Sequence, residues 1–234
     1  MSLSGDDLVE NLARVRDGIA RAADRAGRDA DGVTLVAAAK TVSPDLVRLA
    51  VEAGLHAVGH NYVQELREHR RALADLDVAW HFIGTLQSST AHAVADLADV
   101  VETLAGERAI RRLAGRATRA ERTVDALIEI DLTGGRSGVS PDELDAAVDL
   151  VASLEGVRLR GLMTLPPLTS SAEDARPWFR RLRELGERTR ERRRDLRGDV
   201  LDLSMGMSLD YEVAVEEGAT MVRVGSALFG ARQL

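Results

Sequence analysis

The chain contains no cysteine and few aromatic residues. Without cysteine, its 234 residues can form no disulfide bond, no thiolate nucleophile and no cysteine metal site. Aromatic residues make up 3% of the chain, which disfavours a nucleic-acid module built on stacked rings and leaves Leu, Val and Ala to fill the core. The formal net charge of −7 does not attract nucleic acid or anionic lipid.

Long apolar runs are also missing. No stretch is long enough to span a bilayer, and residues Met1–Asp7 lack the basic and apolar regions of a signal peptide. The arginine-rich segment Arg188–Arg197 is interleaved with acidic residues, which favours a solvated helix face over a polyanion site. We therefore expect a cytoplasmic protein with no membrane or nucleic-acid partner.

Lysine is almost absent as well, and the exception is informative. Of the 31 lysine and arginine residues, only Lys40 is a lysine. Arginine stays protonated, whereas a partly buried lysine can lose its proton and form a Schiff base with a carbonyl compound. Lys40 ends the apolar run Val33–Ala39, a candidate strand that would deliver it to a site. The alternative is a lysine that has survived by chance on a loop.

Strand and helix patterns alternate along the chain. Residues 8–26 have helical apolar spacing and stop near Gly27, and helix starts are expected at Ser43-Pro44 and at Ser140-Pro141, with Glu143 in capping-box position. The short apolar segments that predict strands are Val33–Ala39, His56–Gly59, Ala79–Ile83, Asp99–Thr103, Thr123–Asp131, Arg158–Met163, Val200–Ser204 and Thr220–Val224.

Eight strands, each followed by a helix, predict a (β/α)8 TIM barrel, an α/β fold with its site at the C-terminal ends of the strands. The alternative, an open doubly wound sheet, normally carries a glycine-rich fingerprint after an early strand, and this sequence has none. No linker divides the chain. We expect one domain over residues 1–234, with a helix within residues 1–27 preceding the first strand.

Two turns rich in glycine and serine follow the seventh and eighth candidate strands, where barrels often bind phosphate. Backbone N–H groups at such turns and at the helix starts behind them bind anions without needing a lysine. The residues expected to form this phosphate site are Ser204, Gly206 and Ser208 in the first turn, and Gly225 and Ser226 in the second.

Arg223 lies near the end of the eighth candidate strand. It either places a cation in the barrel mouth or forms a structural ion pair with a carboxylate such as Glu129 or Asp131, and both interpretations remain open. Together with Lys40 and the phosphate site, Arg223 suggests a ligand that is a phosphorylated aldehyde. The leading candidate is pyridoxal 5′-phosphate (PLP).

The histidines do not predict a metal site. His56, His69 and His92 lie at scattered spacings without a matching pattern of carboxylates. His81 lies within the candidate strand 79–83. We favour a structural histidine that is hydrogen-bonded in the core or the mouth over a catalytic base.

Several motifs, in this order, resemble those of the pyridoxal phosphate homeostasis protein family: Ala39-Lys40-Thr41, Gly59–Glu65, Trp80–Gly84, Leu86-Gln-Ser88, Arg160–Met163, Leu203–Ser208 and Met221–Gly225. The resemblance runs from about Val33 to the C-terminus and implies a single barrel similar to the N-terminal domain of alanine racemase. It also implies that Lys40 holds PLP as an internal aldimine, that Asn61 lies near the cofactor ring and that Arg223 faces the pyridine nitrogen. The phosphate-binding segments of the family contain Ser204, Gly206, Ser208, Gly225 and Ser226.

The sequence departs from this family at three positions. The family usually has glutamate where His60 stands, and often has lysine where Thr90 and Arg136 stand. Without those two lysines, Lys40 is the only lysine that can bond the cofactor. Whether the imidazole of His60 touches the cofactor is open.

Carriage of the cofactor is favoured over turnover, although turnover is left open. Alanine racemase takes its second acid/base, a tyrosine, from another domain and subunit; the only tyrosines here are Tyr62 and Tyr211. We therefore expect no catalytic residue. The protein would be a monomer that binds PLP reversibly for intracellular homeostasis and hands it transiently to apo-enzymes. The alternatives are a weak PLP-dependent racemase or decarboxylase, a cofactor-free Schiff-base aldolase and a non-catalytic interaction module.

Overall fold

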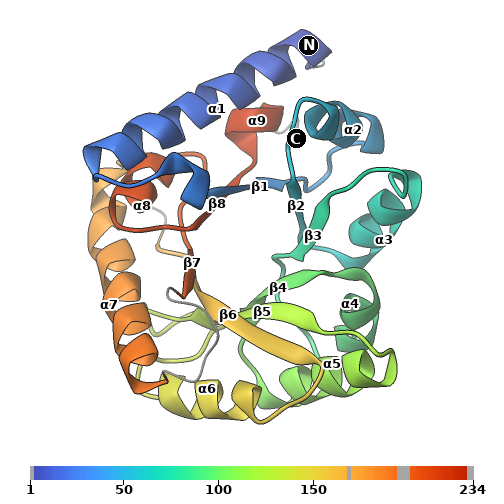
Figure 1. The fold of residues 1–234 in the computed structure, drawn as a ribbon, viewed down its shortest axis with the longest axis vertical. Helices are drawn as coiled ribbons and strands as arrows, with labels where there is room; N and C mark the ends of the chain where they lie inside the picture. Colours follow the sequence, from blue (N-terminus) through green and yellow to red (C-terminus); the bar gives the residue numbers. More distant parts are fainter. Residues whose placement is uncertain (1–2, 168–169, 194–200, 231–234) are drawn as a thin grey trace.

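The computed structural model describes residues 3–167, 170–193 and 201–230. Its eight strands are parallel and close into a barrel in chain order, which confirms the predicted (β/α)8 fold (Figure 1). The strands are β1 (Thr34–Ala38), β2 (Ala57–His60), β3 (Ala79–Phe82), β4 (Val100–Leu104), β5 (Val124–Ile130), β6 (Val157–Thr164), β7 (Asp202–Ser204) and β8 (Met221–Val224). Val200 and the 194–197 part of the arginine-rich segment lie outside the described residues.

The helices surround the barrel, and α1 packs against α8 and α9 (Figure 1). Their bounds are α1 (Gly5–Arg25), α2 (Pro44–Glu52), α3 (Val63–Ala72), α4 (Ala91–Leu97), α5 (Glu107–Arg119), α6 (Leu144–Ala152), α7 (Arg176–Arg192), α8 (Tyr211–Glu216) and α9 (Ser226–Phe229), with short 3-10 turns at Ala30–Gly32 and Glu173–Ala175. None of the helices within the described residues combines the length and apolar character needed to cross a membrane.

The first helix forms where the sequence predicts it. Ser4 caps it, because its side chain accepts a hydrogen bond from Asp7 N while the Asp7 carboxylate accepts one from Ser4 N. The helix ends just before Gly27, whose φ of +63° is a conformation that glycine adopts without strain. Its apolar face is buried, as the spacing predicts.

Of the two other predicted helix starts, one is confirmed and one is wrong by a turn. α2 begins at Pro44, and the Ser43 hydroxyl accepts a hydrogen bond from Leu46 N at 3.4 Å. α6 begins at Leu144 rather than at Pro141. Glu143 N donates to the Ser140 carbonyl at 3.1 Å, a hydrogen bond across three residues that closes a turn over residues 141–143, while the Glu143 carboxylate accepts hydrogen bonds from Ser140 N and the Ser140 hydroxyl.

Apolar side chains form two separate cores. The larger core fills the space between the barrel and its helices, and includes Trp80 and Phe82 of β3. The smaller core comprises the buried residues Leu127, Met163 and Met221. Successive residues of a strand point to opposite faces, so each strand contributes both to the outer layer and to the barrel interior. Ser204 is paired in register with Met163 and Met221, so buried polar side chains lie beside the small core.

Candidate functional site

Lys40 lies just beyond the C-terminal end of β1, at the barrel mouth, and is half-buried. Its Nζ atom is 5.1 Å from the centre of the Tyr62 ring, a cation–π contact. The next residue, Thr41, has a φ of +61°, a strained value for a β-branched residue. Two hydrogen bonds hold this turn: Thr41 N donates to Glu65 Oε1 at 3.3 Å, and Thr41 Oγ1 donates to the Lys40 carbonyl at 2.6 Å. The backbone therefore fixes Lys40 while its amine stays accessible.

The turn after β8 lies at the same rim as Lys40. β1 pairs with β8 in a register that places Val36 opposite Arg223. Two residues further along each strand, the Gly225 backbone approaches Ala38 so closely that an added Cβ would lie 3.2 Å from the Ala38 carbonyl oxygen. The first and last strands thus place Lys40 and the Gly225 turn side by side.

Arg223 points into the barrel interior, and its side chain is only 4% exposed. Its Nη2 donates to the Thr164 carbonyl at 2.9 Å, and its Nη1 donates to the Ser204 hydroxyl. Glu102 Oε2 lies 3.6 Å from Nη1. Burial lowers the pKa of Arg223, against the opposing charges of nearby carboxylates. The guanidinium group is therefore held in one orientation by a carbonyl, a hydroxyl and a carboxylate.

Glu102 is the fully buried centre of this network. Its Oε1 lies 2.7 Å from His81 Nδ1, and its Oε2 accepts a hydrogen bond from the Ser204 hydroxyl at 2.5 Å. Burial alone would raise the pKa of Glu102, but hydrogen bonds from His81 and Ser204 and the charge of Arg223 lower it below its ordinary value. His81 is accordingly a satisfied interior histidine, as the sequence favours.

The partner of Arg223 is therefore Glu102, which the sequence analysis did not single out. A carboxylate in the middle of the apolar strand Val100–Leu104 was the available signal. Burial raises the pKa of Glu129 to about 7, because this side chain is only 7% exposed. The positive charge of Arg223 lowers this pKa, but by less than burial raises it. Asp131 instead accepts hydrogen bonds from its own loop, and the one from Arg136 N is the largest cause that lowers its pKa to about 2.

The turns after β7 and β8 meet at Ser208. Its Oγ accepts hydrogen bonds from Gly225 N and Ala227 N, both at 3.2 Å. The hydroxyl hydrogen of Ser208 takes no part in either bond and is free to donate. Gly206 has a φ of +91°, and an added Cβ would lie 2.5 Å from the Ala214 Cβ, so this turn requires glycine. Ser226 is exposed at the start of α9. Backbone N–H groups and serine hydroxyls at the start of a helix are the kind of donor that binds a phosphate group.

The remaining predicted site residues have different surroundings. The Ser204 hydroxyl is occupied by Glu102 and Arg223, away from the Ser208 turn. Asn61 follows β2 and is half-buried, and the Gly84 backbone packs against it so tightly that an added Cβ would lie 2.1 Å from the Asn61 carbonyl oxygen.

His60 lies in the layer between the barrel and α3. Its ring contacts the rings of His69, at 4.6 Å between centroids, and Trp80, at 6.0 Å. Burial and the neighbouring His69 lower the pKa of His60 to about 3, and both of its ring nitrogens are buried without a hydrogen-bond partner in the described part of the chain. The imidazole thus packs between β2, β3 and α3.

The positions of the two missing lysines lie in the loops that follow β3 and β5. Thr90 directly precedes α4, and Arg136 is exposed in the loop after β5. Residues 3–167, 170–193 and 201–230 bring together no group of three His, Asp or Glu side chains that could hold a metal ion.

Comparison with known proteins assigns the family. The profile of the family described as alanine racemase, N-terminal domain, matches residues 11–233. The pyridoxal phosphate homeostasis protein of Aquifex aeolicus is 40% identical over 226 residues, which cover 96% of this chain and 98% of that protein. The pyridoxal phosphate homeostasis protein of Escherichia coli K12 is 38% identical over 237 residues, which cover 97% of this chain and 97% of that protein. The chain belongs to the pyridoxal phosphate homeostasis protein family.

Solved structures agree with this assignment. PipY of Synechococcus elongatus, solved with PLP bound, has 31% sequence identity and a TM-score of 0.84, over 95% of this chain and all of PipY. Alanine racemase of Clostridium difficile has 12% identity and a TM-score of 0.71, over 96% of this chain and 58% of that enzyme. The second likeness extends to the fold alone.

Proposed function

We propose that the protein binds PLP at the barrel mouth through a covalent bond between Lys40 Nζ and the cofactor aldehyde, and that it serves PLP homeostasis as a carrier. The observation that carries the proposal is the placement of the only lysine at the same rim as the Gly225 turn. When bound, PLP supplies a reactive aldehyde, and the chain supplies the amine and the orientation.

Arg223 would face the pyridine nitrogen. Its guanidinium carries a fixed positive charge and has no acceptor, so it would keep that nitrogen unprotonated. Glu102 and Ser204 hold Arg223 in place, and Asn61 would contact the edge of the ring. Because an unprotonated ring withdraws electrons poorly, this arrangement supports retention of the cofactor over amino-acid turnover.

Ser208, Gly225 and Ser226 would bind the phosphate, with Gly206 shaping the first turn. The Gly225 and Ala227 N–H groups already converge on one oxygen atom, Ser208 Oγ, and a phosphate oxygen could accept from the Ser208 hydroxyl or take over these donors. This site needs no second lysine.

Reversible carriage is supported by the exposure of the mouth. Tyr62, which lies over Lys40, is 49% exposed, so water and an acceptor protein could reach the amine. Because Thr90 and Arg136 provide no alternative lysine, release would proceed from Lys40 alone. A monomer in the cytoplasm that contacts apo-enzymes only transiently is part of the proposal.

The test is an absorbance scan of purified protein titrated with PLP, before and after borohydride. Wild-type protein should show a band at the edge of the visible range that borohydride removes, and Lys40→Ala should show none. Retention of this band in Lys40→Ala would refute the role of Lys40.

Weak racemisation of amino acids is a second candidate, favoured only by the contact of Tyr62 with Lys40. Tyr211 packs against Gly18 of α1 and is not available for this role. Exchange of deuterium into the Cα position of alanine, lost in Tyr62→Phe, would support this activity. No exchange above the rate of free PLP would exclude it.

A further inference from the structure

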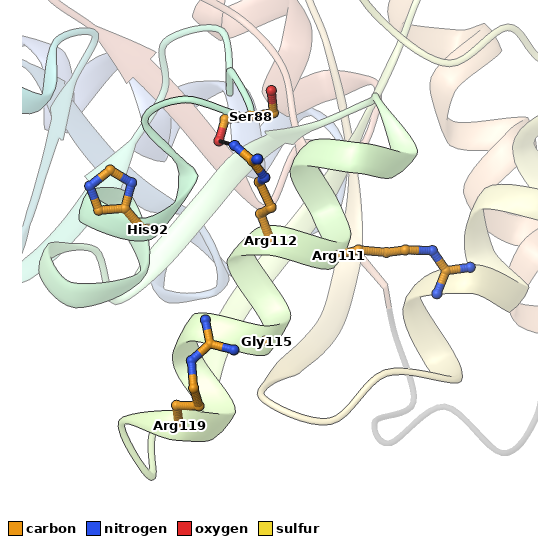
Figure 2. A pocket seen from close by; sticks show the side chains of 6 residues that line it. All are labelled: Ser88, His92, Arg111, Arg112, Gly115 and Arg119. Carbon is orange, nitrogen blue, oxygen red and sulfur yellow. Dashed lines mark hydrogen bonds between the residues drawn. The ribbon is translucent and has the colours of Figure 1, made fainter.

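A cavity of about 370 Å³ lies between α4 and α5, on the outside of the barrel (Figure 2). This volume is at the lower end of the range of about 300–1,000 Å³ for small-molecule sites. Its lining residues are Ser88, His92, Arg111, Arg112, Gly115 and Arg119. Ser88 belongs to the connection between β3 and α4, so the end of the cavity that Ser88 lines is the end nearer the rim of the barrel.

Two of the lining arginines carry charge that no carboxylate in the described residues neutralises. Arg112 Nη1 donates to the Ser88 carbonyl at 3.0 Å, which orients the guanidinium without compensating its charge. Arg119 lies beside Gly115, whereas Arg111 extends to the other side of the helix (Figure 2). Within residues 3–167, 170–193 and 201–230, neither Arg112 nor Arg119 forms an ion pair.

The nearby carboxylates are already occupied by other arginines. Glu107 binds Arg111 at 2.7 Å, and Asp96 binds Arg116 with both of its oxygens, at 2.7 and 3.0 Å. These pairs leave the cavity itself with positive charge, although the whole chain is acidic.

Gly115 is a second, independent feature of the cavity. Glycine in the middle of a helix is destabilising relative to alanine, so its presence calls for a reason. Packing gives none, because the nearest atom to an added Cβ is Arg119 Nη1 at 3.6 Å, an ordinary contact distance. The missing side chain instead keeps the space between α4 and the two arginines open.

We propose that this cavity binds a phosphate group, either as inorganic phosphate or as the phosphate monoester of a small metabolite. The guanidinium forks of Arg112 and Arg119 would donate charge-assisted hydrogen bonds to the phosphate oxygens. The Ser88 hydroxyl and the His92 imidazole offer further donors. The site is separate from the Gly225 and Ser208 turns and does not depend on the proposed cofactor function.

The test follows the Nε–Hε NMR signals of the full-length, 15N-labelled protein at constant ionic strength. Signals of Arg112 and Arg119 are identified by their loss in Arg112→Gln and Arg119→Gln. Sodium phosphate and glycerol 3-phosphate are titrated separately, and these local signals separate the cavity from any phosphate bound near Ser208. Arg71→Gln serves as a matched control, since Arg71 is an exposed arginine at the end of α3.

Both arginine signals should shift saturably with one dissociation constant, and each single glutamine variant should weaken binding about tenfold. Gly115→Ala should raise the melting temperature while it weakens binding several-fold, and Arg71→Gln should leave binding unchanged. Tighter binding of glycerol 3-phosphate would identify a metabolite as the ligand, and equal binding would identify free phosphate. Linear, unsaturable shifts, or full affinity in Arg119→Gln, would overturn the proposal.

Discussion

The two cations of the proposed cofactor site differ in nearly every physical respect. Lys40 stands half-buried at the rim, in contact with the ring of the exposed Tyr62. Arg223 lies inside the barrel. Its guanidinium donates hydrogen bonds to Ser204 and Thr164, and the carboxylate of Glu102 balances its charge. An accessible amine can form and break a covalent bond, whereas a buried guanidinium keeps one orientation. The comparison therefore separates chemistry at the rim from rigidity inside the barrel.

The largest effect is expected from Lys40→Arg. Arginine keeps the positive charge over Tyr62 but cannot form an imine, so cofactor retention through gel filtration should be lost completely. The free energy of unfolding should change by no more than about 0.5 kcal/mol, as for most substitutions away from the core. A large drop in stability would mean that Lys40 is structural, and would end the distinction between the two cations.

Removing the carboxylate of Glu102 should instead lower the stability of the folded protein. Glu102→Ala leaves Arg223 buried without its charge partner, which costs about 3–5 kcal/mol of unfolding free energy. Glu102→Gln should lose less, because the amide can still meet Ser204. Urea unfolding measures both, and Glu107→Gln, at an exposed carboxylate, is the matched control. Wild-type stability in Glu102→Ala would show that the network does not hold Arg223.

Glu129 should make stability depend on pH. Its pKa is raised from 4.5 to about 7 in the folded protein, so the folded state binds this proton more tightly than the unfolded chain does. The stabilisation is present below pH 4.5 and is lost as pH rises to about 7, by up to roughly 3 kcal/mol at about 1.4 kcal/mol per pH unit. Unfolding in urea at several pH values should show this slope in wild type and a flatter one in Glu129→Gln. Equal slopes would contradict the raised pKa.

The smallest effect is expected at the phosphate turns. Ser208→Ala removes one hydroxyl donor and should weaken PLP binding roughly fivefold, or about 1 kcal/mol, measured by absorbance titration. Stability should change little, because water can satisfy the Gly225 and Ala227 N–H groups. If affinity stays at the wild-type value, the phosphate binds elsewhere.

The fold and the rim were predictable from the sequence because their signals are local. Alternating apolar segments gave the barrel, and a lone lysine at the end of a strand gave Lys40. The interior network was not predictable in the same way. Glu102, His81, Ser204 and Arg223 come from four different strands, and only closure of the barrel brings them together.

Two other features, the environment of His60 and the start of α6, could not be predicted from the sequence either. Whether the imidazole of His60 touches the cofactor could not be predicted, because the direction of its side chain depends on how the short strand β2 is placed in the closed barrel. The helix start at Ser140 was wrong because the chain closes a turn first, through the hydrogen bond from Glu143 N to the Ser140 carbonyl, and the sequence does not distinguish such a turn from the first turn of a helix.

The most direct test of the central claim is a peptide map of PLP-loaded protein reduced with borohydride. Lys40 is the only side chain of the sequence that carries a primary amine. The reduced pyridoxyl group should be found on the peptide that contains Lys40. Modification confined to the N-terminal peptide, or none at saturating PLP, would contradict it.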